Sequence, residues 1–282
     1  MPLWLSVAGL TDVGRQRELN EDRFYYKVVQ SSDEGSLALL VVADGMGGHM
    51  AGEVASQWTV STLKRELAPL FRPQDPSLTR RLDAEDLAAV GSGVTVRLDE
   101  TDLARLLEHA VARANQVLLG YARKHSEEAG DMGSTLTLAV VEGERVTVAH
   151  VGDSRAYLWR QGRLRQLTED HSVPGALLKQ GRISPEEARD HPHRHILYRC
   201  LGLQPKLEID LYPAFPVEPG DALLLCSDGL WDMVYPDERL AGYLASEAGP
   251  LAICRRLVDA ANEAGGDDNV TVLLARVEAR DG

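Results

Sequence analysis

One stretch constrains the fold of this chain more than any other. The apolar run from Leu37 to Ala43 ends abruptly in Asp44-Gly45-Met46-Gly47-Gly48-His49. The run is short and rich in Leu and Val, which predicts a buried strand with Asp44 at its end. The glycines allow unusual backbone angles and let a carbonyl oxygen approach a ligand closely. A carboxylate beside such a carbonyl suits a hard divalent cation, whereas an ordinary Asp-Gly turn is the simpler alternative.

Periodicity predicts both strands and helices along the rest of the chain. Strands are expected at residues 5–10, 24–29, 134–141, 145–151, 155–160, 163–167, 207–212, 222–226 and 270–277, and helices at 51–67, 103–121, 173–179, 185–189, 237–245 and 251–264. The four strands between residues 134 and 167 are separated by tight turns, which predicts a meander of antiparallel hairpins. Prolines and glycines interrupt residues 69–99, which we interpret as a peripheral insertion. No linker or repeat divides the chain, so we expect one domain over residues 1–282.

Composition excludes several classes of protein. The 282 residues are 44% hydrophobic and 26% charged, as in globular proteins. The formal net charge of -13 argues against nucleic-acid binding, which needs a basic face. No apolar stretch is long enough to span a bilayer, and the first residues do not resemble a signal peptide. The three cysteines form no CxxC pair, so we expect reduced thiols and a cytoplasmic location.

Acidic residues recur where apolar segments begin or end. Besides Asp44, such positions are held by Glu21, Asp22, Asp153, Asp228, Asp267 and Asp268. Strands packed side by side bring their ends together, so these acids could meet at one rim of a sheet. Gathered carboxylates repel one another, and a cation is the natural way to stabilise them. Oxygen ligands favour magnesium or manganese, while the alternative for each acid is a turn or helix cap.

Arg17 is the candidate group for binding an anion. A guanidinium can hold two oxygens of a phosphoryl group at once. The alternative is a surface salt bridge with Glu18 or Glu21, which would contribute little to stability.

In their order along the chain, these residues resemble the metal-dependent serine/threonine protein phosphatases, the protein phosphatase 2C-like family in its bacterial form. The matching segments are Thr11-Asp12-Val13-Gly14 with Arg17, Asn20-Glu21-Asp22, Asp44 to His49, Met132-Gly133-Ser134-Thr135, Gly152-Asp153-Ser154-Arg155, Ser227 to Asp232, and Asp268-Asn269. Each is weak alone, but the ordered set spans nearly the whole chain and is specific. The resemblance implies an α+β fold, a four-layer α-β-β-α sandwich of two antiparallel sheets flanked by helices. It also implies a metal cleft at one end, with residues 168–200 as a mobile flap beside it.

The resemblance also implies a set of metal ligands. Asp44 would bridge two metal ions, with the carbonyl oxygen of Gly45 on one of them. Asp228 and Asp268 would hold the other ion. Asp153, together with Asp228, would match a third and weaker metal site of bacterial relatives.

Further roles follow from the same resemblance. Asp22 and Glu21 would act through metal-bound water, and Arg17 would bind the substrate phosphate. Animal relatives carry a general-acid histidine where this chain has Met46, which cannot donate a proton. We do not expect His49 to replace that histidine.

The hypothesis is hydrolysis of phosphoserine and phosphothreonine in proteins with two Mn2+ or Mg2+ ions, and room for a third. A metal-activated bridging water would attack phosphorus without a phosphoenzyme intermediate. We expect phosphorylated proteins as substrates, a cognate serine/threonine kinase as antagonist, and a monomer. The alternatives are a catalytically inactive phosphatase-like binding or regulatory module and a two-metal nuclease, which the acidic charge disfavours.

Two local patterns have competing interpretations. His191, His193 and His195 could form a metal site, but the neighbouring Pro192 and Arg194 favour an exposed loop. Trp231 could stack on substrate, but large aromatic side chains mainly supply buried area, which favours core packing.

Overall fold

The apolar run that defines the sequence is the central strand β3 (Gly35–Met46) in the computed structural model, which describes residues 3–31, 35–48, 51–71 and 100–279. Residues 38–43 are all buried. The strand pairs with β2 (Asp22–Ser31) on one side and with β5 (Leu136–Glu142) on the other. Layers cover both of its faces, which is why its sequence is continuously apolar rather than alternating.

β3 extends past the predicted strand end. Gly45 and Met46 pair with the two-residue strand β4 (Gly133–Ser134), so the prediction that Asp44 ends the strand was wrong. Asp44 is held inside a strand that continues on a different partner. The acid is therefore fixed by backbone pairing on both sides, whereas a turn would have left it free to move.

The strands form two antiparallel sheets. One has the order β1 (Leu3–Asp12), β11 (Val270–Ala279), β10 (Ala222–Cys226), β7 (Arg155–Arg160), β8 (Arg163–Gln166). The other has the order β2, β3, β5, β6 (Arg145–Val151), β9 (Asp210–Pro216), with β4 attached to β3. The strand predicted at 207–212 thus begins three residues later and reaches Pro216, because β6 pairs with that stretch.

The predicted four-strand meander was also wrong. β5 pairs with β6 and β7 pairs with β8, but β6 and β7 belong to different sheets. The chain crosses between the sheets through Gly152-Asp153-Ser154. Gly152 has a φ of 113° there, and a Cβ on it would lie 2.6 Å from Cβ of Thr135, so the crossing requires glycine.

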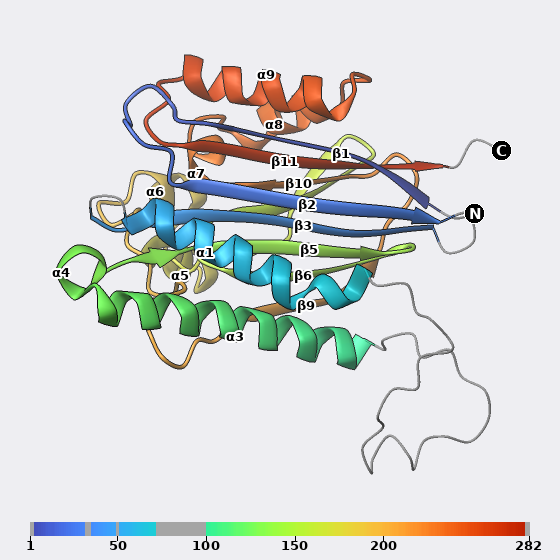
Figure 1. Ribbon diagram of the computed structural model, residues 1–282. Helices are drawn as coiled ribbons and strands as arrows, with labels where there is room; N and C mark the ends of the chain where they lie inside the picture. The colour runs from blue at the N-terminus through green and yellow to red at the C-terminus, as the bar shows by residue number, and fades with distance from the viewer. Residues whose placement is uncertain (1–2, 32–34, 49–50, 72–99, 280–282) are drawn as a thin grey trace, which may run out of the picture.

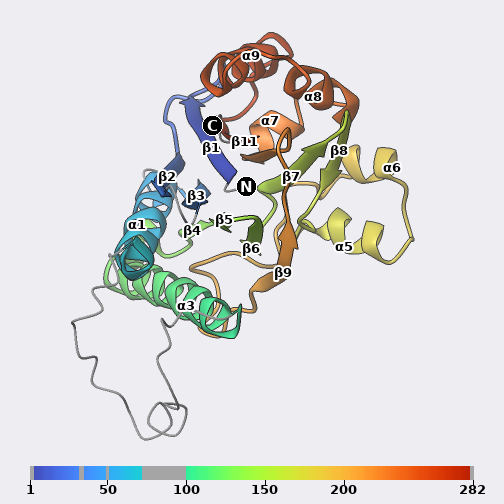
Figure 2. The same ribbon diagram turned by 90° about the vertical axis from the view of Figure 1, so that its right-hand side faces the viewer.

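Helices cover the outer face of each sheet (Figure 1). Helices α1 (Ala51–Glu66) and α3 (Glu100–Lys124) pack on the β3 sheet, and α8 (Asp237–Leu244) and α9 (Pro250–Glu263) pack on the other. A third apolar cluster fills the space between the sheets. Figure 2 shows these layers in the view along the strands. The predicted four-layer α-β-β-α sandwich is confirmed.

The remaining short elements lie mostly away from the chain termini (Figure 1). The 168–200 segment forms α5 (Val173–Lys179) and α6 (Pro185–Arg189), as predicted, and Ser172 and Ser184 cap their N-termini. Helix α7 (Asp228–Trp231) was not predicted because it has only four residues. Helix α4 (Ser126–Ala129) follows α3, and a 3-10 helix, Ala68–Phe71, follows α1. His49 and residues 72–99 of the predicted insertion lie outside the described residues.

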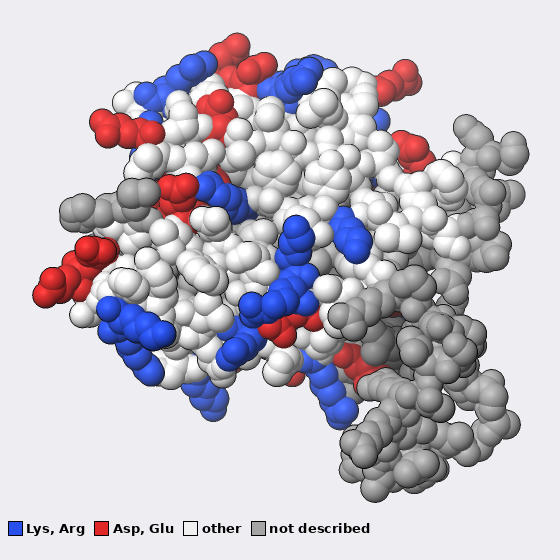
Figure 3. All heavy atoms as spheres, in the orientation of Figure 1, with Lys and Arg blue, Asp and Glu red and all other residues white. Residues whose placement is uncertain are grey.

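Charge is spread unevenly over the described surface. On the face seen in Figure 3, Lys and Arg side chains stand in separate groups between uncharged and acidic residues. None of the helices in the described ranges combines the length and the apolar character that a bilayer crossing requires.

Candidate active site

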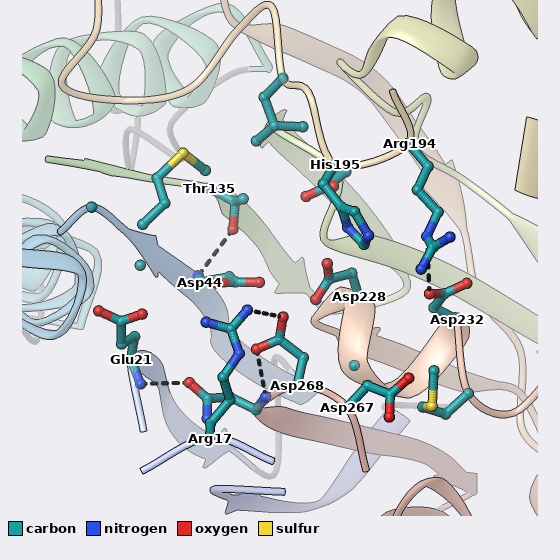
Figure 4. A pocket seen from close by; sticks show the side chains of 18 residues that line it. Arg17, Glu21, Asp44, Thr135, Arg194, His195, Asp228, Asp232, Asp267 and Asp268 are labelled. Carbon is teal, nitrogen blue, oxygen red and sulfur yellow. Dashed lines mark hydrogen bonds and ion pairs between the residues drawn. The ribbon is translucent and has the colours of Figure 1, made fainter. Parts of the chain in front are cut away.

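The dispersed acids of the sequence meet in one pocket of about 380 Å³. Its predicted members are Arg17, Glu21, Asp44, Gly45, Asp153, Asp228 and Asp268. Asp22 lies behind them and is fully buried. These residues come from five separate parts of the chain, and Figure 4 shows the side chains of Arg17, Glu21, Asp44, Asp228 and Asp268 around the pocket. The fold therefore brings together every residue that the sequence proposed for the site.

Backbone pairing fixes the position of Asp44. Asp44 stands directly opposite Asp22 in the β2–β3 ladder. The backbone N–H of Asp44 donates to Oγ1 of Thr135 at 2.9 Å, and its carbonyl oxygen accepts from the N–H of Thr135 at 2.8 Å. Thr135, which breaks the strand between β4 and β5, thus clamps the strand that carries Asp44.

Close backbone approach brings Asp228 beside Asp268. Asp228 opens helix α7, and Gly229 follows it. A Cβ on Gly229 would lie 2.2 Å from the carbonyl oxygen of Asn269, so only glycine permits this contact. Oγ of Ser227 donates to Asp22 at 2.7 Å, which joins the same turn to β2.

Asn269 organises the loop that carries Arg17 and Glu21. Its Nδ2 donates to the carbonyl oxygens of Val13 and Leu19, both at 2.9 Å. Its Oδ1 accepts from the backbone N–H of Glu21 at 2.7 Å. The sequence showed Asn269 only as part of a motif. Its three hydrogen bonds join it to residues more than 240 positions earlier in the chain, and only the fold reveals them.

Burial and mutual repulsion perturb the acids of the pocket. Burial raises the pKa of Asp22 to about 7, against the effect of hydrogen bonds from Ser227 and Thr271. Burial also raises the pKa of Asp228 to about 7, and the charge of Asp268 adds to the rise. The pKa values of Asp44 and Asp153 are raised well above their usual range by burial and by neighbouring carboxylates. A cluster of buried carboxylates is stabilised either by protonation of some of its members or by a bound cation.

The residues fit a divalent metal ion. Oδ1 of Asp22, Oδ1 of Asp228 and Oε1 of Glu21 are buried without a hydrogen-bond partner among the described residues. Lone carboxylate oxygens of this kind are the ligands that Mg2+ and Mn2+ prefer. Within the described ranges, no three Asp, Glu, His or Cys side chains already form a coordination shell. Asp268 and Asp22 are instead turned toward Arg17 and Ser227.

Arg17 lies at the mouth of the pocket. Its Nη2 donates to Oδ2 of Asp268 at 2.6 Å, and its side chain is 49% exposed. Burial works against the charge of Arg17, but the carboxylates of Asp268, Glu21 and Asp228 together outweigh it and raise the pKa of the guanidinium. The partner is therefore Asp268, and not the Glu18 or Glu21 of the alternative salt bridge (Figure 4).

The loop of Asp153 is held by Trp231. Nε1 of Trp231 donates to the carbonyl oxygen of Asp153 at 3.0 Å, and the guanidinium of Arg155 lies 3.6 Å from the centre of the indole ring. Trp231 packs against the apolar cluster beneath α8 and α9 and does not line the pocket. Core packing, rather than stacking on substrate, is thus the interpretation that the contacts support.

Sequence reasoning missed that three residues of the 168–200 segment, Arg194, His195 and Leu197, line the pocket. Arg194 and His195 both line it, and Nε of Arg194 lies 4.0 Å from Asp232 (Figure 4). His191 and His193 stay in the turn before them, with ring centres 5.6 Å apart. Among the described residues, the three histidines do not group into a metal site. One of them, His195, nevertheless faces the pocket from the loop that we expected to be merely exposed. The only sequence signal for these pocket-lining residues was their place within the predicted flap, residues 168–200.

Gly45 illustrates how closely the pocket wall is packed. A Cβ on Gly45 would lie 1.9 Å from the carbonyl oxygen of Gly52 in the first turn of α1. Gly45→Ala should therefore destabilise the fold by roughly 1–3 kcal/mol, because the backbone of either β3 or α1 must move to make room for the added methyl group. Thermal or urea unfolding would measure the change. Gly120→Ala is the matched control, since Gly120 lies in α3 with open space around its missing Cβ and should be neutral or stabilising; equal effects of the two variants would contradict the prediction.

Comparison with known proteins agrees with this geometry. The family model described as protein phosphatase 2C matches residues 13–259. The serine/threonine phosphatase stp of Listeria welshimeri is 39% identical over 264 residues, which cover 94% of this chain and 92% of that protein. The serine/threonine protein phosphatase PstP of Mycobacterium tuberculosis is 35% identical over 98% of this chain and 45% of its own length.

Solved structures show the same relationship. A crystal structure of the Mycobacterium tuberculosis phosphatase PstP/Ppp has a TM-score of 0.77 at 35% identity, covering 98% of this chain and 99% of that one. The catalytic domain of PstP in complex with two manganese ions has a TM-score of 0.76 at 33% identity, covering 98% and 100%. With its fold, its gathered acids and these matches over nearly its whole length, the chain belongs to the protein phosphatase 2C family.

Proposed function

We propose that this protein is a metal-dependent serine/threonine phosphatase that hydrolyses phosphoserine and phosphothreonine in proteins. One observation carries the proposal: Asp44, Asp228 and Asp268 face a single pocket that also holds Arg17. An inactive phosphatase-like module would not need these carboxylates, whose burial and repulsion destabilise the fold unless something binds them. A two-metal nuclease is disfavoured by the net charge of -13 and by the phosphatase relatives.

The proposed ligands are those that the family resemblance implies, and all of them except Asp22 line the pocket. Asp44 and the carbonyl oxygen of Gly45 would hold one divalent cation, with Asp44 shared by a second cation that Asp228 and Asp268 hold. Asp22 and Glu21 would act through water, and Asp153 with Asp228 would hold a third ion. Bound Mn2+ or Mg2+ would supply Lewis-acid polarisation of the phosphoryl oxygens and an activated water.

The chain's own residues bind and orient the substrate. Arg17 uses one guanidinium nitrogen for Asp268, so the rest of the fork can bind phosphoryl oxygens. Met46 lines the pocket next to Gly45 and cannot donate a proton to the leaving group. The pocket-lining residues among those described include no cysteine, which suits direct attack by water rather than a cysteinyl-phosphate intermediate. We propose that the 168–200 segment serves as a flap beside this pocket.

Hydrolysis of a phosphopeptide tests the proposal directly. Purified protein with Mn2+ should release inorganic phosphate from a phosphothreonine peptide, and strong chelation should abolish the release. Turnover that survives chelation would overturn the metal-dependent mechanism. No turnover of any phosphopeptide or small phosphate ester under any divalent cation would favour the inactive module.

Arg17 should contribute mainly to binding of the phosphoryl group. Arg17→Ala should lower kcat/KM for a phosphopeptide by about 10²-fold, the usual size for one lost charged donor at a transition state. Arg17→Lys should recover part of the loss, because it keeps a positive charge beside Asp268 but not the planar fork. Steady-state kinetics at saturating Mn2+ would measure both variants.

A nearby arginine provides the control for that prediction. Arg15 is exposed two residues earlier and does not line the pocket, so Arg15→Ala should change kcat/KM less than threefold. Equal losses in the Arg15 and Arg17 variants would show that general surface charge, rather than a specific contact, is responsible.

The cellular setting is proposed from the sequence. We infer a cytoplasmic monomer that acts on phosphorylated proteins, opposes a serine/threonine kinase and does not bind nucleic acid. The three cysteines are separate buried thiols, which is compatible with a reducing compartment.

A further inference from the structure

A second cavity is lined by residues that follow directly in the chain on His195 and Leu197 of the catalytic pocket. It has a volume of about 560 Å³ and is lined by residues between Tyr198 and Glu208. Its apolar lining comes from Tyr198, Leu203 and Leu207. Tyr198 is 43% exposed and Leu203 is 48% exposed, so both can contact a bound chain. Exposed apolar groups around a concavity are characteristic of binding sites.

The loop that forms this cavity is firmly held. Asn115 of α3 donates through Nδ2 to the carbonyl oxygen of Gln204 at 2.8 Å, and its Oδ1 accepts from the N–H of Gly202 at 2.8 Å. Asn115 itself is buried. Gly202 has a φ of 90°, and a Cβ on it would lie 2.6 Å from the carbonyl oxygen of Met132. The apolar lining is therefore pre-organised, which lowers the entropic cost of binding.

The two cavities share one wall. His195 and Leu197 line the catalytic pocket, whereas Tyr198 and Arg199 line the second cavity. His195 and Tyr198 are three positions apart, so their Cα atoms are separated by at most about 11 Å even when the chain is fully extended. An extended peptide whose phosphorylated residue lies in the catalytic pocket would therefore reach the second cavity within about three to five residues.

The charges of the second cavity restrict what it can bind. Nη1 of Arg199 donates to Oδ1 of Asp210 at 2.6 Å, and Nη2 donates to Oε2 of Glu208 at 2.9 Å. Both terminal nitrogens of Arg199 are thus engaged by carboxylates, which disfavours a second phosphate there. Lys206 also lines the cavity, and the apolar side chains of Tyr198, Leu203 and Leu207 are the part of the lining that an uncharged residue can pack against.

We propose that this cavity binds a bulky aliphatic side chain of the phosphoprotein substrate, three to five residues from the phosphorylated residue. The inference rests on the proposed phosphatase function and adds a sequence preference to it. Leu203 is the specificity-determining residue, because it is exposed, lines the cavity and lies outside the catalytic pocket.

A phosphopeptide library tests this proposal. Phosphothreonine peptides in an alanine background would carry one leucine at each position from -6 to +6, with p-nitrophenyl phosphate as a substrate too small to reach the cavity. We expect leucine at one position three to five residues away to raise kcat/KM about five- to twentyfold over alanine. Leu203→Ser should abolish that preference and leave turnover of p-nitrophenyl phosphate unchanged. Leu203→Asp should shift the preference at the same position from leucine to lysine.

Leu251→Ser is the matched control, because Leu251 is similarly exposed but lies on α9, outside both cavities. This variant should keep the leucine preference. Peptide turnover without a leucine preference, or a preference unchanged in both Leu203 variants, would overturn the subsite but leave the phosphatase function intact. Failure to hydrolyse p-nitrophenyl phosphate and every peptide would instead overturn the proposed function itself.

Discussion

Asp44→Asn should lower kcat for a phosphopeptide by at least about 10³-fold with Mn2+ present, because several kcal/mol of transition-state stabilisation depend on the cations that this carboxylate is proposed to share. The amide has nearly the same shape and is neutral. It keeps the backbone contacts with Thr135 and the pairing with Asp22, since both use main-chain atoms of Asp44. The loss should therefore come from weaker cation binding rather than from misfolding.

Two measurements separate those causes. Isothermal titration with Mn2+ should show affinity weakened by at least about a hundredfold, since even ligand-supporting residues commonly contribute ten- to a hundredfold. Melting of the metal-free variant at neutral pH should occur at the same or a higher temperature, because one repelling carboxylate is gone. Asp259→Asn, an exposed acid on α9, should change neither quantity. Full activity of Asp44→Asn would contradict the proposed mechanism.

The metal-free protein should become less stable as the pH rises from 5 to 8. Asp22 is fully buried and its pKa is raised to about 7, so the folded chain holds a proton that the unfolded chain releases near pH 4. A raised folded-state pKa means that this contribution to stability is complete below about pH 4 and is lost as the pH passes through about 7. Of this contribution, about 4 kcal/mol in total, about 3 kcal/mol is lost between pH 5 and 8, or roughly 5–10 °C in melting temperature for a chain of this size.

Divalent cations should remove that pH dependence. A cation binds the charged carboxylates that the proton otherwise neutralises, so Mn2+ should raise the melting temperature more at pH 8 than at pH 5. Asp22→Asn should reduce the slope of the metal-free protein, and the other buried acids of the pocket should supply what remains. Asp131→Asn, an exposed acid outside the pocket, should leave the slope unchanged. A metal-free melting temperature that is constant or rises between pH 5 and 8 would show that burial does not keep Asp22 protonated in the folded chain.

Strong local patterns explain which elements could be predicted. The α3 helix followed from nine apolar residues at helical spacing, and its apolar face is the face buried on the β3 sheet. The prediction that β6 and β7 pair with each other was wrong because the local pattern at their connection is ambiguous. The Gly-Asp turn there has the same local sequence whether the next strand pairs with the last one or joins another sheet. Only the packing of Gly152 against Thr135 distinguishes the two cases.

The sequence by itself determined which residues could do the chemistry. Asp44, Asp228 and Asp268 stood out because acids recur where apolar segments begin or end, and Arg17 because a guanidinium can hold a phosphoryl group. The order of all four also resembles a known family. Local sequence carries side-chain chemistry and backbone propensity, so these residues could be named without coordinates. Distances between residues 200 positions apart are not encoded locally.

Tertiary structure alone decided the surroundings of that chemistry. It turned Asn269 into the anchor of the Arg17 loop, brought Arg194 and His195 over the pocket, and shaped a second cavity around Leu203. Each of these contacts joins segments whose proximity depends on how two sheets and their helices pack. Packing is a property of the whole chain, which is why no single stretch of the sequence could reveal it.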